Sequence, residues 1–208
     1  GEPALVDWKR FPWPESVAWF ARGYGSMRNG NLDESRRAIA RLGELEAQAE
    51  TAGEEVFARQ IKILRLELEA WNAHAAHDDD GALALLQQAV ELESGTPKPP
   101  VTPAPTLPAS EQLGDLQTEL GHPAQALAAY RQSLQAYPRR FNSTLGAARA
   151  LAATGDSAGA AEEYCALLRI AGNGSRASLD EARRFVDANP LGADGAPLNC
   201  NVEQTASH

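Results

Sequence analysis

A repeat of thirty-four residues constrains the fold of this 208-residue chain more than any other feature of its sequence. A glycine, an alanine and a tyrosine recur at that spacing in the same order: Gly121, Ala126 and Tyr130, then Gly155, Ala160 and Tyr164. Apolar residues within each copy return every three or four positions, which is typical of α-helices. A repeat of this length indicates small helical units that stack, because one unit alone cannot bury its apolar face.

Each unit is predicted to be a pair of helices joined by a tight turn. Gly30, Gly121 and Gly155 precede the second helix of the first, third and fourth units, and glycine tolerates the positive φ of a sharp turn. His77 takes that place in the second unit, which weakens the match of this copy. A small residue five positions after the turn and a bulky one nine positions after it complete the pattern: Ser35, Ala82, Ala126 and Ala160, and Ile39, Leu86, Tyr130 and Tyr164.

These residues resemble the tetratricopeptide repeat. The resemblance covers roughly residues 15–172 and implies an all-α solenoid of helical hairpins that binds ligands in a concave groove. The first two intervals between units are longer than 34 residues, because longer helices fill one and a proline-rich stretch fills the other. The motif matches lie in the first unit and, best of all, in the third: Trp19, Gly23 and Gly30, then Leu113, Gly114, Gly121, Ala126, Tyr130 and Pro138.

The same pattern divides the chain into four helix pairs, a capping helix and two flanking segments. Residues 1–14 are aromatic and proline-rich; they are expected to pack on the first pair, with an exposed aromatic patch as the alternative. A helix at 177–188 is expected to cap the array, and 190–208 is a tail without periodicity. The solenoid itself is predicted over 15–189, with repeats at about 16–52, 54–94, 107–138 and 141–172 and helices at 15–29, 33–51, 54–77, 80–94, 107–120, 123–137, 141–154 and 157–171.

Prolines crowd the stretch of about 95–108. Six of the thirteen residues from Thr96 to Pro108 are proline, which excludes a helix interior and favours an extended, polyproline-type segment. One interpretation is an ordered strap across the solenoid, anchored by Val101 and Leu107. The other is a linker between two domains.

Composition narrows the classes of partner. The net charge of −9 argues against a nucleic-acid or anionic membrane partner, since both need a basic surface. No apolar run approaches the eighteen or so residues of a membrane helix, so no membrane insertion is expected. No signal-peptide pattern opens the sequence, and its start at Gly1 leaves open that it is a piece of a longer protein. Known catalytic and phosphate-binding motifs are missing, so we expect neither an enzyme nor a cofactor.

The resemblance implies a binding groove lined by the first helix of each pair. At one end of the groove we expect an aromatic platform for a peptide side chain; the alternative is that Phe20 packs against Trp71 as core. In the middle of the groove we expect acidic residues that favour a basic partner; the alternative is a solvated acidic face. The oligomeric state is left open. The predicted groove residues are Phe20, Tyr24, Arg28, Glu67, Trp71, His74, Glu111, Asp115, Glu119 and Arg149.

Two further family likenesses bear on the partner. One subfamily of the repeat binds chaperone carboxyl termini with a cluster of Lys, Arg and Asn, which this sequence lacks. The chain is also similar to the C-terminal repeat region of larger bacterial tetratricopeptide proteins, through Pro100-Val101-Thr102-Pro103 ahead of the third unit. A bacterial scaffold or peptide-binding module is therefore the main hypothesis, and a structural spacer within a larger chain is another.

His74 and His77 carry an alternative function. Two histidines three positions apart share a helix face and, with Asp78, Asp79 and Asp80, suit a metal-binding or enzyme accessory module. The competing interpretation is a helix end followed by an acidic N-cap run, with Asp80 at the start of the next helix. No metal site is predicted, because two spaced ligands fall short of the three or four that a site needs.

Cys165 and Cys200 are the only cysteines. A disulfide between them would hold the tail against the second helix of the fourth unit and would indicate an oxidising compartment such as a bacterial periplasm. The alternative is a buried Cys165 and a free Cys200, which leaves a cytoplasmic location open.

Overall fold

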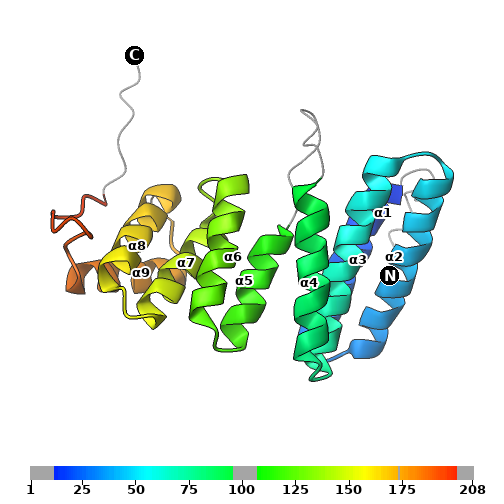
Figure 1. The fold of residues 1–208 in the computed structure, drawn as a ribbon, viewed down its shortest axis with the longest axis horizontal. Helices are drawn as coiled ribbons and strands as arrows, with labels where there is room; N and C mark the ends of the chain where they lie inside the picture. The colour runs from blue at the N-terminus through cyan, green and yellow to red at the C-terminus, as the bar shows by residue number, and fades with distance from the viewer. Residues whose placement is uncertain (1–11, 96–106, 173, 201–208) are drawn as a thin grey trace, which may run out of the picture. The chain divides into compact units, whose positions relative to one another are not determined.

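The computed structural model describes residues 12–95, 107–172 and 174–200, and these form nine α-helices (Figure 1). The chain divides into two compact units, Gly1–Ala109 and Ser110–His208. The first unit contains α1 to α4, and the second contains α5 to α9, except for the first residue of α5, Ala109. The described residues contain no strand beyond one isolated bridge, so the all-α prediction is confirmed. The helices are α1 Pro12–Arg28, α2 Leu32–Thr51, α3 Glu55–Ala75, α4 Asp79–Ser94, α5 Ala109–Glu119, α6 Pro123–Ala136, α7 Phe141–Ala153, α8 Ser157–Ala171 and α9 Ala177–Ala188.

The turn inside each helix pair has the conformation that the repeat predicted. Gly30, Gly121 and Gly155 have φ angles of 78°, 75° and 87°, and His77 adopts the same left-handed turn with φ 64°. The second pair therefore follows the frame despite its missing glycine. A histidine has a steric cost there that glycine avoids, since its Cβ crowds the backbone at positive φ.

We therefore expect His77→Gly to raise the stability of the first unit by about 1 kcal/mol. Thermal unfolding followed by circular dichroism measures the change. The matched control is Gly121→His in the second unit, where nothing lies within 4 Å of an added Cβ and only the backbone cost of about 1 kcal/mol applies. A loss of stability on His77→Gly would show that the imidazole makes a compensating contact.

The residue after each turn begins the second helix. The side chains of Asn31, Asp78 and Asp156 each accept a hydrogen bond from the backbone N–H three positions on, at 2.9 to 3.2 Å. Such caps satisfy one of the N–H groups that a helix start leaves without a partner. The acidic run predicted at the start of the fourth helix is confirmed: Asp78 is the cap, and Asp79 and Asp80 lie in the first turn of α4.

The first helix begins earlier than predicted. α1 starts at Pro12, so it includes the last three residues of the predicted flanking segment, and proline is tolerated in a first turn. Trp13 therefore belongs to α1, and its ring stacks on Phe57 of α3 with centroids 6.3 Å apart. The rest of that segment, residues 1–11, lies outside the described residues.

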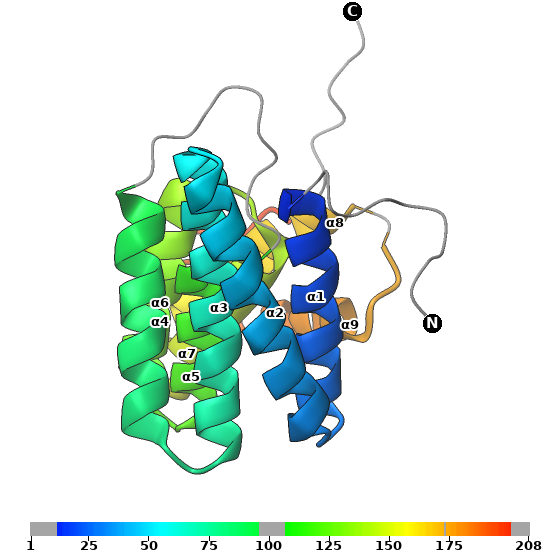
Figure 2. The same ribbon diagram turned by 90° about the vertical axis from the view of Figure 1, so that its right-hand side faces the viewer.

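The apolar core of the first unit lies among α1, α2 and α3, and α4 packs on α3 (Figure 2). Gly23 lets α1 approach closely, since an added Cβ would lie 2.7 Å from the Cβ of Ala38 on α2 and closer still to Leu68 of α3. Leu107, near the end of the proline-rich stretch, packs against this cluster. The remainder of that stretch, 96–106, is outside the described residues, so the strap and the linker both stay open.

Two tyrosines organise the second unit, thirty-four residues apart as predicted. Tyr130 of α6 lies between Gly114 of α5 and Gly146 of α7, where an added Cβ on either glycine would strike its ring. Tyr164 of α8 belongs to the cluster that holds Ala148 of α7 and α9. The ring of each tyrosine thus fills the space between two helices that are next but one in the chain, α5 and α7 for Tyr130 and α7 and α9 for Tyr164, where the partner residues are small.

α9 caps the second unit over the residues that the sequence predicted. Leu179 and Ala182 are buried against α7 and α8, and the ring of Phe185 lies 4.9 Å from that of Tyr164. Ala182 stands thirty-four residues after Ala148, so α9 takes the place of the first helix of a further repeat. Its outward residues are charged, as a terminal helix requires.

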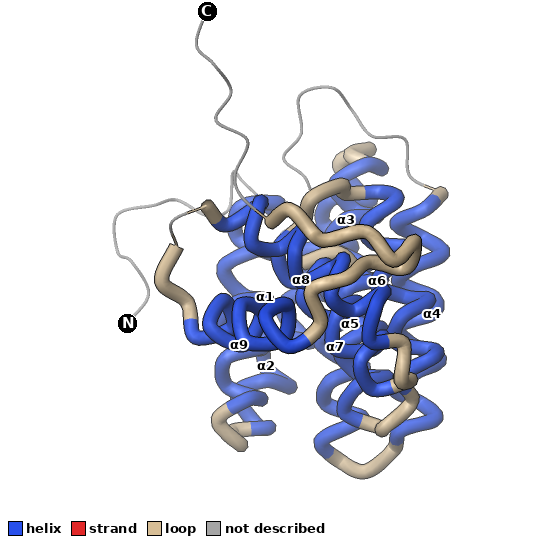
Figure 3. The backbone as a smooth tube through the Cα atoms, turned by 90° about the vertical axis from the view of Figure 1, so that its left-hand side faces the viewer, coloured by secondary structure: helices blue, strands red, loops and turns tan. Residues whose placement is uncertain are grey.

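The chain after α9 folds back along α8 (Figure 3). Gly192 N–H donates to Ala196 O at 2.9 Å and closes a small loop, and Ala193 N–H donates to the Glu162 carboxylate of α8 at 2.7 Å. Arg169 donates to Asn199 O at 3.0 Å. Cys165 of α8 is joined to Cys200 by a disulfide, so the bonded alternative is confirmed.

Candidate functional site

The predicted groove residues divide between the two units, six in the first and four in the second. The six in the first unit come together along α1 and α3. Phe20 stacks on Tyr24 with centroids 5.9 Å apart, Tyr24 meets Trp71 edge-on at 6.1 Å, and Trp71 meets His74 at 5.9 Å. The guanidinium of Arg28 lies 5.8 Å from the Trp71 ring centroid.

Burial determines which residues of this aromatic row a partner can contact. Phe20 and Trp71 are 3% and 1% exposed, and Glu67, one turn before Trp71, is fully buried. These side chains belong to the interior, which favours the alternative in which Phe20 and Trp71 are core. Arg28 is exposed, and Tyr24 and His74 are half-buried, so these three are the members of the row that a partner can reach.

The second unit buries one of its four predicted residues. Glu111 of α5 is 1% exposed, and Arg140 donates to both of its oxygens, from Nε at 2.7 Å and from Nη2 at 3.0 Å. Ser143 of α7 donates to the same carboxylate and bonds Ser133 of α6 at 2.8 Å. Glu111 therefore ties three helices together.

The other three residues lie at or near the surface of the second unit. Asp115 accepts a 2.7 Å hydrogen bond from the Tyr130 hydroxyl; burial, and then the Asp115 charge, raise the pKa of that phenol. Glu119 is exposed. Arg149 makes a two-armed ion pair with Glu181 of α9, and its hydrogen bonds lower the pKa of the Glu181 carboxyl.

The histidines of the metal hypothesis have local roles. His74 Nδ1 lies 2.6 Å from the Asp79 carboxylate at the start of α4, and His77 forms the turn described above. Within the described ranges, no three side chains among His, Cys, Asp and Glu gather as a metal site requires.

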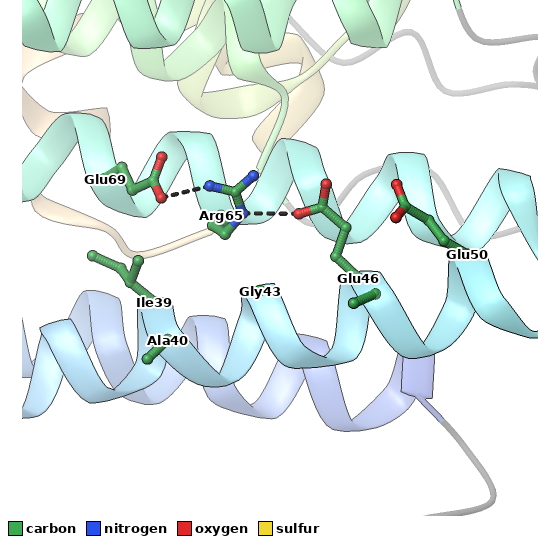
Figure 4. Close-up of a pocket in the computed structure, with 8 residues that line it drawn as sticks. Ile39, Ala40, Gly43, Glu46, Glu50, Arg65 and Glu69 are labelled. Atoms are coloured by element: carbon green, nitrogen blue, oxygen red, sulfur yellow. Dashed lines mark hydrogen bonds and ion pairs between the residues drawn. The ribbon is translucent and has the colours of Figure 1, made fainter.

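Sequence analysis did not predict the hollow between α2 and α3 (Figure 4). It measures about 430 Å³ and opens to solvent along the helices. The predicted groove used only the first helix of each pair and so did not include α2. The small residues three and four positions apart on α2 are the sequence feature that could have indicated the hollow. Its lining, called the α2–α3 hollow below, consists of Ile39, Ala40, Gly43, Glu46, Ala47, Glu50, Arg65 and Glu69.

Arg65 organises the charges of the α2–α3 hollow. Its Nε donates to Glu46 of α2 at 2.8 Å and its Nη1 to Glu69 of α3 at 2.7 Å, as Figure 4 shows. Burial acts to lower the pKa of Arg65, but the hydrogen bonds to the two carboxylates outweigh it and leave the pKa above its usual value. This ion pair fixes α2 to α3 along one side of the hollow.

The helices alone define the class: an all-α protein of helical hairpins packed as consecutive pairs, repeat-like in arrangement. Neither a family model nor a curated protein matches the sequence. Of the helices described, none is long and apolar enough to cross a membrane.

Proposed function

We propose that this chain is a non-catalytic binding module of the tetratricopeptide type, which holds a protein or peptide partner on the faces of its stacked hairpins. The observation that carries the proposal is a recurrent packing arrangement, in which Tyr130 fills the space between α5 and α7 and Tyr164 the equivalent space between α7 and α9. Arrays built in this way present extended surfaces made of many small units, and such surfaces suit elongated partners. Fold alone does not fix function, so the proposal needs a binding test.

The acidic character of the chain supports a basic partner. The formal charge is −9, and each unit has an exposed carboxylate, Glu50 in the first and Glu119 in the second. The Cys165–Cys200 disulfide supports action in an oxidising compartment, such as a bacterial periplasm, because the cytosol keeps thiols reduced. Thiol trapping in the cells that make the protein tests this: a pair that is free to react would contradict it.

Selection of short random peptides on the immobilised protein tests the proposed function. We expect a shared motif among the selected peptides, saturable binding by calorimetry, and recovery of each peptide chemically unchanged. An unrelated helical protein of similar net charge serves as the control surface. No enrichment over that surface, or conversion of the bound peptide to a product, would refute the proposal.

Salt should weaken the binding of the selected peptides. Ion pairs at a solvated surface are screened within a Debye length, which is about 10 Å at 0.1 M salt and about 3 Å at 1 M. Calorimetric titrations across that range should show a steady loss of affinity for lysine- and arginine-rich peptides. Affinity that does not change with salt would assign recognition to apolar contacts instead.

A further inference from the structure

We propose that the α2–α3 hollow is the docking site for a helix of a partner protein that presents lysine or arginine on its contact face. The inference rests on the proposed binding function and names the surface and the chemistry of the partner. Shape, an unexplained glycine and charge support it independently.

The shape suits a third helix. Ala40, Gly43 and Ala47 follow one another at intervals of three and four along α2, so they form one stripe facing the hollow. From Ile39 to Glu50 the stripe is about 16 Å long, which is about three helical turns. Small side chains let two helix backbones approach closely, and the neighbouring α3 supplies the second wall of a groove.

Gly43 has no internal reason to be glycine. At Gly23 an added Cβ would collide with α2 and α3, whereas at Gly43 the nearest heavy atom would be Arg65 Cδ at 3.8 Å, an ordinary contact. A glycine in the middle of a helix costs about 1 kcal/mol relative to alanine. The packing of α2 on α3 does not require a glycine at position 43. The close approach of a partner's backbone to this position would require one.

The charges select a basic partner. Three carboxylates, Glu46, Glu50 and Glu69, and one guanidinium, Arg65, line the hollow, so its formal charge is −3 + 1 = −2. Arg65 engages one oxygen of Glu46 and one of Glu69, and Glu50 is exposed at the end of the stripe. The stem of a lysine or arginine would lie on Ile39 and Ala47, with its charged head at the carboxylates.

Other occupants fit less well. An anionic ligand would meet the net negative charge of the lining. A small neutral molecule would remain largely in contact with water, because the hollow is open along its length, whereas ligand pockets bury most of their ligand. A helix covers the whole stripe and brings its own cations.

The test is a selection from a library of alanine-based helical peptides of about 18 residues, randomised at about five positions on one face. The library is selected on the wild-type chain, and each enriched peptide is then measured against Gly43→Leu, which fills the hollow. We expect enriched peptides to carry Lys or Arg at the randomised positions and to bind Gly43→Leu at least about tenfold more weakly. Leucine is the better helix former, so Gly43→Leu should melt no lower than the wild type.

A charge-matched pair of variants completes the test. Glu50→Lys lies in the hollow and Glu91→Lys lies on α4, exposed and outside it. We expect Glu50→Lys to lower the affinity for the basic peptides by roughly tenfold and Glu91→Lys to change that affinity by less than about twofold. Equal effects of the two variants would assign binding to the overall charge of the chain and overturn the site.

The outcomes separate this inference from the proposed function. Peptides that bind wild type and Gly43→Leu alike, or that lack basic residues, overturn the hollow as a site while the binding function stands. Random short peptides that bind when no helical peptide is enriched lead to the same conclusion. Self-association of the chain that Gly43→Leu abolishes would assign the hollow to a second copy and also overturn the proposal. If neither library yields a binder, both proposals fall.

Discussion

Loss of the Cys165–Cys200 disulfide should lower the free energy of unfolding of the second unit by about 4 kcal/mol. The bond joins residues 35 apart, and closing a loop of that length removes about this much conformational entropy from the unfolded chain. Cys200→Ser is the variant of choice, because Cys165 is 1% exposed and a serine there would bury a hydroxyl. Chemical denaturation followed by circular dichroism measures the difference.

Two controls make the disulfide result specific. Reduction of the wild type with a dithiol should reproduce the loss seen for Cys200→Ser, and the same reductant should leave Cys200→Ser unchanged. All four tryptophans lie in the first unit, so their fluorescence provides a separate record of that unit. A Cys200→Ser variant as stable as the wild type would mean that the hydrogen bonds of Glu162 and Arg169 hold the tail on their own.

The helices could be predicted closely because their signals are local. A left-handed turn residue precedes the second helix of each pair, and a capping side chain follows it in three of the four pairs; both signals are present in Gly155-Asp156. The tyrosine rings that fill the space between helices recur at a fixed spacing, which exposes the stacking. Residues 177–188 were also predicted as a capping helix from local signals, Ser178 and Leu179 at the start and Asn189-Pro190 at the end, and α9 has those bounds.

The candidate site was less predictable, because exposure depends on what packs against a residue from elsewhere in the chain. Trp71 has the helical register of a groove residue, yet it is buried. The register of Glu111 likewise points outward, but Arg140, beyond the next helix, closes over its carboxylate. The α2–α3 hollow depends on small side chains three and four positions apart on α2, and the groove prediction, which used the first helix of each pair, did not include that helix.

The buried ion pair of Glu111 and Arg140 should give the second large effect. Its two-armed geometry resembles that of Arg149 and Glu181, but Glu111 has a side-chain exposure of 1% and Glu181 one of 33%. Removing one partner of a buried pair leaves a charge without compensation and costs about 3–5 kcal/mol. Removing one partner of an exposed pair costs about 1 kcal/mol or less, because water solvates the remaining charge.

We therefore expect Arg140→Met to destabilise the second unit by about 3–5 kcal/mol and Arg149→Met by about 1 kcal/mol or less, measured by denaturant unfolding. The double variant Glu111→Met/Arg140→Met should recover much of the loss, since an apolar pair of similar volume replaces a buried ion pair at little cost. Such recovery would show that the carboxylate left behind, and not the missing arginine stem, causes the defect. If the double variant is less stable than Arg140→Met, the hydrogen bonds that link Glu111 to Ser143 and Ser143 to Ser133 contribute more than the ion pair does.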